Sequence, residues 1–293
     1  MSVAPWVLIT VGAAFLQNLR SFLQRRLTGQ LSVNGASYVR FAYALPFAAC
    51  YAAWLGMRDP VGMPGPDFFL YSGVGGIAQV LATVALLASF SGGNFAVGTA
   101  LSKTETLQAA LFGLLLLGEG VSAIALVGVV VSFAGVVLLS SRGSLLALSR
   151  IERGVAAGLL AGTGFAISAV AYRGAALALP AGDAVTRASV TLLSALTIQT
   201  ATAGLYLALR ERGELQRVWA ARRTGVLVGL IGATASVGWF TAMTLTNAAL
   251  VRAVGQVELL FTFATALWIL REKVALAEVV GAVLVLGGIL LLL

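Results

Sequence analysis

The chain lacks most of the residue types on which enzymes and soluble domains depend. It has no histidine, a single cysteine (Cys50), and charged side chains at only 10% of its 293 positions. Without histidine, imidazole acid–base catalysis and the usual zinc sites are excluded, and one cysteine excludes a disulfide framework. A soluble domain carries about 25% charged residues because its surface faces water. We therefore exclude a soluble protein and expect no metal, nucleotide or other cofactor.

Apolar residues make up 59% of the sequence, and the mean hydropathy is +0.98. A helix that crosses a bilayer needs roughly 20 mainly apolar residues, and apolar runs of that length follow one another along the chain. They predict an all-α polytopic membrane protein with ten transmembrane helices. The expected helices lie near residues 4–24, 33–56, 68–90, 95–118, 121–141, 154–177, 184–209, 224–246, 248–270 and 274–293.

The 19 lysines and arginines are distributed unequally between alternate connections. The positive-inside rule places the richer connections in the cytoplasm, which leaves both termini on the non-cytoplasmic side with Arg58 and Arg173. The net charge of +8 thus belongs to short loops and not to a basic domain that could bind nucleic acid. The cytoplasmic connections hold Arg20, Arg25, Arg26, Arg142, Arg150, Arg153, Arg210, Arg212, Arg217, Arg222, Arg223, Arg271 and Lys273.

Sliding the chain against itself reveals a duplication. Residues 94–140 align without a gap to residues 247–293 at an offset of 153, and such internal periodicity signals a repeated unit. A slightly shorter offset pairs Arg40 with Arg187, each near the start of a predicted helix. The pairs at the main offset include Asn94 with Asn247, Glu105 with Glu258, Glu119 with Glu272, Gly128 with Gly281 and Gly135 with Gly288.

The duplication predicts two five-helix halves, at residues 1–146 and 147–293. Because five is an odd number, the second half enters the membrane from the opposite side, which makes an inverted repeat. Secondary transporters are commonly built in this way and bind substrate near the bilayer midplane between the repeats. Two halves of similar packing energy can exchange conformations, and the exchange turns an outward opening into an inward one.

Two segments resemble a known family. Residues 114–139 (LLLLGEGVSAIALVGVVVSFAGVVLL) and 267–292 (LWILREKVALAEVVGAVLVLGGILLL) are similar to the helix–Glu–helix signature of the EamA branch of the drug/metabolite transporter superfamily. Arg40 and Arg187 also resemble that family. The resemblance implies a central cavity lined by the first, third, fourth, sixth, eighth and ninth helices, in an inner-membrane protein. Within the family, the chain is similar to YddG-type exporters of aromatic and other amino acids.

Glu105 and Glu258 lie near the middle of predicted membrane helices, where an unpaired ionisable group is costly and marks a functional candidate. One interpretation is a proton-coupling carboxylate whose pKa is raised by burial. The other is a structural ion pair, with Arg40 and Arg187 of the same halves as possible partners. The symmetry of the two glutamates favours structural pairing, because a single substrate site breaks symmetry.

Lys103 and Arg252 do break the symmetry, since their repeat partners are Gln256 and Thr99. Residues four apart share a helix face, so Arg252 and Gln256 point together. Residues two positions apart are separated by roughly 200° around the helix axis, so Lys103 faces away from Glu105. We expect Lys103 or Gln256 to face the cavity, where a cation can bind a substrate carboxylate. The alternative for Lys103 is pairing with a neighbouring glutamate or snorkelling.

Four further residues are candidates for substrate contact on helices that the resemblance places around the cavity. Gln79 and Trp239 offer an amide and a flat stacking surface, and Asn18 and Ser168 are weaker candidates of the same kind. Glu119, at the turn between two predicted helices, is expected to cap the second of them.

The sequence thus predicts a secondary transporter that exports amino acids or similar small metabolites by alternating access. A multidrug or nucleotide-sugar carrier on the same scaffold is the first alternative, and it would favour an accessible, unpaired glutamate for lipophilic cations. A passive channel is the second, whereas a lipid-modifying enzyme would need clustered His, Asp or Cys. Ten helices enclose a cavity in one chain, so we expect a small-molecule substrate and the bilayer as partners, and function as a monomer.

Overall fold

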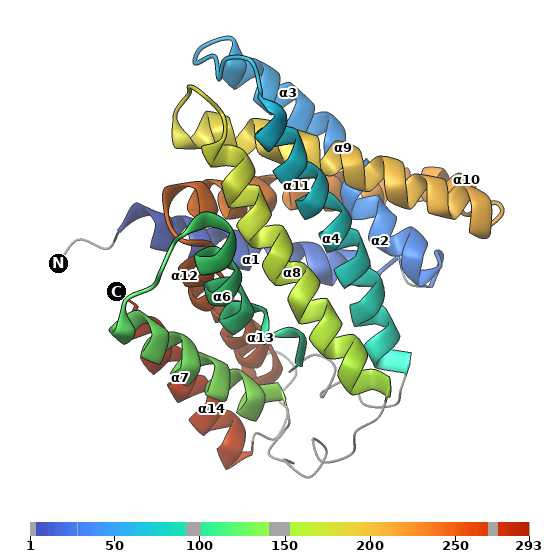
Figure 1. Ribbon diagram of the computed structural model, residues 1–293. Helices are drawn as coiled ribbons and strands as arrows, with labels where there is room; N and C mark the ends of the chain where they lie inside the picture. The colour runs from blue at the N-terminus through green and yellow to red at the C-terminus, as the bar shows by residue number, and fades with distance from the viewer. Residues whose placement is uncertain (1–3, 28, 92–100, 141–152, 269–274, 293) are drawn as a thin grey trace. The chain divides into compact units, whose positions relative to one another are not determined.

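The computed structural model of the protein describes residues 4–27, 29–91, 101–140, 153–268 and 275–292, all of whose regular structure is helical. Asn94, Thr99, Glu272 and the loop cations Arg142, Arg150, Arg271 and Lys273 lie outside these ranges. The helices are α1 (Pro5–Arg25), α2 (Val33–Ala42), α3 (Leu45–Gly56), α4 (Pro66–Ser91), α6 (Glu105–Leu117), α7 (Ala123–Ser140), α8 (Arg153–Leu177), α9 (Ala184–Arg210), α10 (Glu214–Ala220), α11 (Arg222–Leu245), α12 (Ala248–Val254), α13 (Val257–Trp268) and α14 (Leu276–Leu290) (Figure 1).

Each of the predicted apolar segments overlaps a helix or a pair of helices. Four helices are long and apolar enough to cross a membrane by length and composition, namely Pro5–Gln24, Pro66–Ser89, Ala184–Arg210 and Arg222–Leu245. The shorter apolar helices of the described chain include α6, α7 and α14. The number of crossings therefore stays a prediction, whereas the all-helical class is observed for the described residues.

Two predicted helices are interrupted. The segment 33–56 divides into α2 and α3 because Pro46 stands in the first turn of α3, where it lacks an N–H and restricts the residue before it. The segment 248–270 divides into α12 and α13 at Gly255 and Gln256. The loop between α9 and α11 holds an additional helix, α10, that apolar run length does not reveal.

The start of α6 repeats the break between α12 and α13. The amide of Thr106 donates to the carbonyl of Lys103 (3.4 Å), and the amide of Leu259 donates to that of Gln256 (3.0 Å). These two i→i−3 bonds join repeat-equivalent residues, and they tighten the backbone as a 3₁₀ turn does. Thr104 contributes by donating its hydroxyl to the carbonyl of Leu101 (2.6 Å), which competes with the regular helix ladder.

The described chain forms two compact units, and each contains parts of both sequence halves. Unit 1 comprises residues 1–11, 81–170 and 246–293, and unit 2 comprises residues 12–80 and 171–245. The boundaries between the units fall within α1, α4 and α8.

In unit 1, α7 and α14 pack side by side (Figure 1). A Cβ added at Gly128 would lie 2.8 Å from the carbonyl oxygen of Gly288, and one at Gly135 would lie 2.6 Å from that of Gly281. Position 128 thus meets 288 while 135 meets 281, so the two helices run antiparallel. The glycines allow the backbones to approach closely, as small residues do in membrane proteins.

In unit 2, α9 and α11 pack together, and α2 and α3 lie against them. Tyr43 fills the space left by two glycines of α11, since a Cβ at Gly229 would lie 2.4 Å from the Tyr43 backbone. The first turns are capped in the usual way: the Ser32 hydroxyl accepts from Gly35 N (2.9 Å) in α2, and the Asp183 carboxylate accepts from Thr186 N (2.7 Å) in α9.

Candidate functional site

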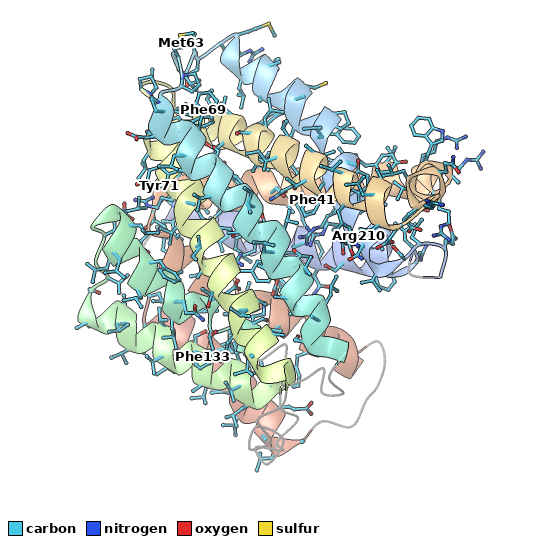
Figure 2. The ribbon with its side chains drawn as sticks, turned by 45° about the vertical axis from the view of Figure 1, so that its right-hand side comes forward. Phe41, Met63, Phe69, Tyr71, Phe133 and Arg210 are labelled. Atoms are coloured by element: carbon cyan, nitrogen blue, oxygen red, sulfur yellow. The ribbon has the colours of Figure 1, made fainter. Side chains whose placement is uncertain are left out.

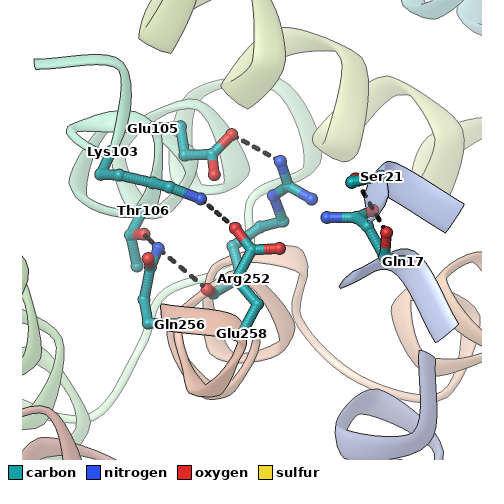
Figure 3. Close-up of polar contacts among 8 residues, drawn as sticks. All are labelled: Gln17, Ser21, Lys103, Glu105, Thr106, Arg252, Gln256 and Glu258. Carbon is teal, nitrogen blue, oxygen red and sulfur yellow. Dashed lines mark hydrogen bonds and ion pairs between the residues drawn. The ribbon is translucent and has the colours of Figure 1, made fainter. Parts of the chain in front are cut away.

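Four charged side chains meet in unit 1 at the two broken helices (Figure 3). Arg252 Nη2 of α12 donates to Glu105 Oε2 of α6 at 2.5 Å. Lys103, two residues before Glu105, donates from Nζ to Glu258 Oε1 of α13. The four charges sum to zero, and each ion pair joins a residue of the first sequence half to a residue of the second.

This pairing departs from the partners considered from the sequence. Arg40 and Arg187 belong to unit 2, whereas the glutamates pair with Arg252 and Lys103 within unit 1. The alternative in which Lys103 pairs with a glutamate is the one that the structure shows, and that glutamate is Glu258. Lys103 and Glu105 have different partners, Glu258 and Arg252, as expected if the two side chains face different directions.

The two pairs differ in exposure. The Glu105 side chain is 5% exposed and that of Arg252 is 20% exposed, whereas Lys103 and Glu258 are exposed by 16% and 18%. A buried ion pair is costly to break from one side because it leaves an uncompensated charge. Glu105 is thus the most buried of the four charged side chains, whereas Lys103, Glu258 and Arg252 are all partly exposed.

Gln256 completes the cluster from the break between α12 and α13. Its Nε2 donates to Thr106 Oγ1 (2.9 Å) and to the carbonyl of Arg252 (3.3 Å), so it shares a face with Arg252 as the spacing predicted. Gln256 is 2% exposed, and no described residue donates to its Oε1. A buried acceptor of this kind is available to a donor that enters the site.

A chain of neutral polar groups positions α6 from α8, also within unit 1. Thr163 donates its hydroxyl to Gln108 Oε1 (2.6 Å), and Gln108 Nε2 donates to Thr104 Oγ1 (2.8 Å). A Cβ at Gly162 would lie 2.6 Å from that same Oγ1, so glycine permits the approach. Sequence reasoning missed Gln108 and Thr163, although the four-residue spacing of Thr104 and Gln108 places them on one helix face.

Unit 2 holds a separate polar cluster without charge. Gln79 Oε1 of α4 accepts from the Tyr172 hydroxyl (2.7 Å) and from Gln199 Nε2 (2.6 Å), and Gln199 Nε2 also lies 2.8 Å from the Tyr172 oxygen. The Tyr172 ring stacks on Phe240 with centroids 4.5 Å apart. Gln79 was predicted from the sequence, but Tyr172 and Gln199 were not. The signal that could have revealed Gln199 is an amide in the middle of an apolar helix.

The remaining predicted residues are placed as follows. Trp239 is 7% exposed in α11, beside Phe240. Asn18 is half-buried in α1, where the hydroxyl of Ser21 donates to the carbonyl of Gln17 (2.8 Å; Figure 3). Ser168 is buried and donates to the carbonyl of Phe165 in its own helix (2.8 Å).

The predicted substrate residues are thus divided between the units. Lys103, Gln256 and Ser168 belong to unit 1, and Gln79, Trp239 and Asn18 belong to unit 2. The structure brings Lys103 and Gln256 into one cluster. In unit 2, Gln79 hydrogen-bonds to Tyr172, which stacks on the neighbour of Trp239 in α11.

Arg40 and Arg187, one from each sequence half, both lie in unit 2. Arg40 stacks its guanidinium over the Phe41 ring, 4.5 Å from the centroid. Arg187 lies half-buried in the first turns of α9, after the cap residue Asp183. The two arginines, which are equivalent in the sequence repeat, thus belong to the same unit of the structure.

The predicted cap at Glu119 lies four residues before α7, and the described cap contact comes from another residue. The cap is Ser122, whose hydroxyl accepts from Ala125 N (3.1 Å), because α7 begins at Ala123 and leaves Glu119 in the preceding turn. The backbone carbonyl of Glu119 accepts from Asn247 Nδ2 (3.4 Å). Within the described ranges, no group of three His, Cys, Asp or Glu side chains could hold a metal ion.

Comparison with known proteins identifies the family. A model of the EamA-like transporter family matches the chain twice, at residues 4–141 and 152–293. A solved structure titled "Crystal structure of protein" is 18% identical over 99% of this chain and 97% of its own, with a TM-score of 0.74, and this likeness shows the fold alone. A search of curated proteins found no match. Since the two family matches cover nearly the whole sequence, the chain belongs to the EamA-like transporter family and is a multi-pass membrane transporter.

Proposed function

We propose that this transporter moves a zwitterionic metabolite, an amino acid in the first instance, across a bacterial-type inner membrane by alternating access. The observation that carries the proposal is the neutral cluster of two cations and two carboxylates at the breaks of repeat-equivalent helices. Discontinuous helices supply substrate and ion sites in many secondary transporters. The cluster combines such breaks with charged groups of both signs.

The chemistry of the Lys103–Glu258 pair suits a zwitterion. When this pair opens, Lys103 can bind the substrate carboxylate and Glu258 can bind the substrate ammonium, so no net charge is added to the site. Charge-assisted hydrogen bonds of this kind are short and strong at low dielectric. Gln256 Oε1, which accepts from no described residue, offers a further acceptor to the ammonium.

The pairing of the charges in the cluster argues against a multidrug or nucleotide-sugar carrier. A carrier of lipophilic cations favours an unpaired carboxylate, but Glu105 and Glu258 both have cationic partners. A carrier of nucleotide sugars must bind phosphate groups, which favours a surplus of cations. The described cluster has no such surplus.

Alternating access is supported by the packing of α7 and α14. These helices belong to the two proposed halves, 1–146 and 147–293, and their antiparallel contact has the geometry that an inverted repeat requires. The positive-inside rule then orients the chain with both termini outside the cytoplasm. One chain supplies both halves, so we expect transport by a monomer.

The test is exchange in proteoliposomes preloaded with unlabelled amino acids and assayed with a panel of labelled ones. We expect saturable exchange of a subset, and its loss in Lys103→Met with retention in the matched control Arg58→Gln, because Arg58 is exposed at a helix end. Absence of exchange for every amino acid tested contradicts the proposal. Non-saturating flux with electrical conductance would instead indicate a channel.

Coupling to protons is tested in the same vesicles with an imposed pH gradient. Protonation of Glu258 releases Lys103, so exchange that follows the gradient would assign Glu258 as the coupling carboxylate. Glu258→Gln keeps an acceptor oxygen for the substrate ammonium but cannot titrate, so exchange should weaken and the exchange that remains should no longer respond to the gradient.

A further inference from the structure

The connection between α9 and α11 carries an exposed basic surface in unit 2. All five arginines of residues 210–223 are exposed, and Trp219 and Leu215 of α10 are exposed by 67% and 37%. Arg222 lies over the Trp219 ring, 5.7 Å from its centroid. We call this surface the basic patch, and it comprises Arg210, Arg212, Arg217, Trp219, Arg222 and Arg223 (Figure 2 labels Arg210).

The two acids of the same segment face inward and do not neutralise the patch as a whole. Glu214 is fully buried, and its Oε1 accepts from the backbone amide of Ser32 (2.7 Å) while Oε2 pairs with Arg217. Glu211 accepts from the Ser32 hydroxyl (2.5 Å) and from Asn34 Nδ2 (2.6 Å). The carboxylates are thus held at the N-terminus of α2, where anions interact favourably with the free amides.

The patch is also fixed in position. Val218 of α10 is buried in a core cluster with Leu27 and Val228, and its carbonyl accepts from the Tyr43 hydroxyl (3.0 Å). Glycine at position 35 leaves room for Glu214, whose Oε1 lies 2.0 Å from where a Cβ would stand. The segment 210–223 therefore presents its arginines and Trp219 outward, with α10 anchored to the core of unit 2.

A further exposed cation, Arg26, lies at the same end of unit 2. Arg26 lies over the Phe22 ring at the end of α1, 5.6 Å from the centroid, and the next residue, Leu27, is in the core cluster that holds Val218. Cations combined with exposed aromatic rings at the end of a spanning helix are typical of the interface between membrane and water.

We propose that the basic patch binds the headgroups of anionic phospholipids, with Trp219 at headgroup depth and the arginines on the phosphates. The shape and charge of the patch support this partner. An exposed tryptophan flanked by arginines suits the membrane–water interface, where the ring lies at headgroup level, and each arginine near an anionic surface contributes about a five-fold preference for it. The inference concerns a site separate from the charged cluster, and its test does not require transport.

The test uses Trp219 as the probe. The purified protein is reconstituted with increasing fractions of brominated phosphatidylglycerol or brominated phosphatidylcholine, and the Trp219 signal is the difference between the native protein and Trp219→Phe. We expect Trp219 to prefer phosphatidylglycerol by more than about ten-fold, since several arginines act together. Equal quenching by the two lipids overturns the proposal.

The matched control is Trp54, which is 43% exposed and has a single cation, Arg58, over its ring at 4.2 Å. Its signal, obtained from Trp54→Phe, should show a preference of at most about five-fold. A preference at Trp54 as large as that at Trp219 would attribute the effect to general enrichment of anionic lipid and overturn the proposal.

The triple variant Arg212→Gln/Arg222→Gln/Arg223→Gln leaves the Glu214–Arg217 pair in place. We expect it to lose the preference while brominated phosphatidylcholine still quenches Trp219, which shows that the helix remains at the interface. Retention of the preference overturns the proposal. Excess inorganic phosphate should leave the preference of the native protein unchanged, and its abolition would assign the patch to free phosphate instead.

Discussion

The breaks at the start of α6 and between α12 and α13 have the same backbone hydrogen bonding, but their cations stand at different positions. Each is tightened by an i→i−3 bond between equivalent residues, and each places a glutamate just beyond the turn, Glu105 in one case and Glu258 in the other. The cations stand at non-equivalent positions, 103 and 252. The comparison teaches that the duplicated framework is conserved in form while the charges that face it have diverged.

The strongest test of this comparison is the removal of a single cation. Arg252→Met leaves Glu105, whose side chain is 5% exposed, without its ion-pair partner, and breaking a buried pair from one side costs about 3–5 kcal/mol. Lys103→Met should cost less, because Glu258 is 18% exposed and so is less buried than Glu105. Thermal unfolding of both variants in detergent measures the difference.

The control for this prediction is the double variant Glu105→Leu/Arg252→Met. Replacing a buried pair by apolar side chains is often nearly neutral, so most of the stability lost in Arg252→Met should return. A double variant no more stable than Arg252→Met would contradict a structural role for the pair.

The shared framework makes the opposite prediction for the glycines of α7 and α14, namely equal effects at equivalent positions. An added Cβ would lie 2.8 Å from a backbone oxygen at both Gly128 and Gly281, so Gly128→Ala and Gly281→Ala should each destabilise by about 1–3 kcal/mol. Gly287→Ala is the matched control, because nothing lies within 4 Å of its Cβ position. Melting temperatures that differ strongly between positions 128 and 281 would refute the symmetry.

A neutral cluster should respond more weakly than a charged one. Tyr172→Phe removes the hydroxyl that Gln79 and Gln199 contact but keeps the ring stacked on Phe240, so we expect a loss of about 1 kcal/mol. Tyr206→Phe, at a ring that is 50% exposed, should be close to neutral in the same melting assay. A loss in Tyr172→Phe as large as that in Arg252→Met would remove the distinction between the clusters.

The caps of α2 and α9 give the smallest effect. The Thr186 amide holds the pKa of the Asp183 carboxyl below its usual value of 3.8. The associated stability is therefore present above the unfolded pKa and is lost as the pH falls through the lower folded pKa. Asp183→Asn keeps a good cap and should change stability by only about a few tenths of a kcal/mol at pH 7, while the part of the acid dependence below about pH 4 that arises from Asp183 disappears.

Unfolding curves of the native protein and Asp183→Asn between pH 3 and 7 test this point. Ser32→Ala removes the hydroxyl cap of α2 and does not touch Asp183, so the part of the acid dependence that arises from Asp183 should remain in this variant. An unchanged acid slope in Asp183→Asn would disprove the role of the carboxylate.

The location of the helices could be predicted from the sequence, because apolar length alone determines where a chain can cross lipid. The breaks could not, since they depend on local competition for hydrogen bonds, such as that of the Thr104 hydroxyl for the Leu101 carbonyl. The helix α10 was not predicted, because its seven residues are too few and too charged to form an apolar run.

The site shows the same division. Intramembrane position marked Lys103, Glu105, Arg252 and Glu258 as candidates, but periodicity gives the face of a helix and not the residue opposite it. The partners came from the other sequence half, and only tertiary packing could reveal them. Tyr172 and Gln199 were missed because neutral polar residues in a membrane helix carry a weaker signal than charges do.

The close contact of α7 and α14 has the form of an isologous interface, in which one surface meets its own equivalent. Gly128 touches Gly288 where Gly281 touches Gly135, and the two contacts interchange under the repeat offset, as they would at the two-fold axis of a homodimer. In a homodimer of identical halves, each substitution would appear twice around the axis. In a single chain the two halves can differ, so the contact between α7 and α14 can keep its symmetry while each half carries cations at its own positions.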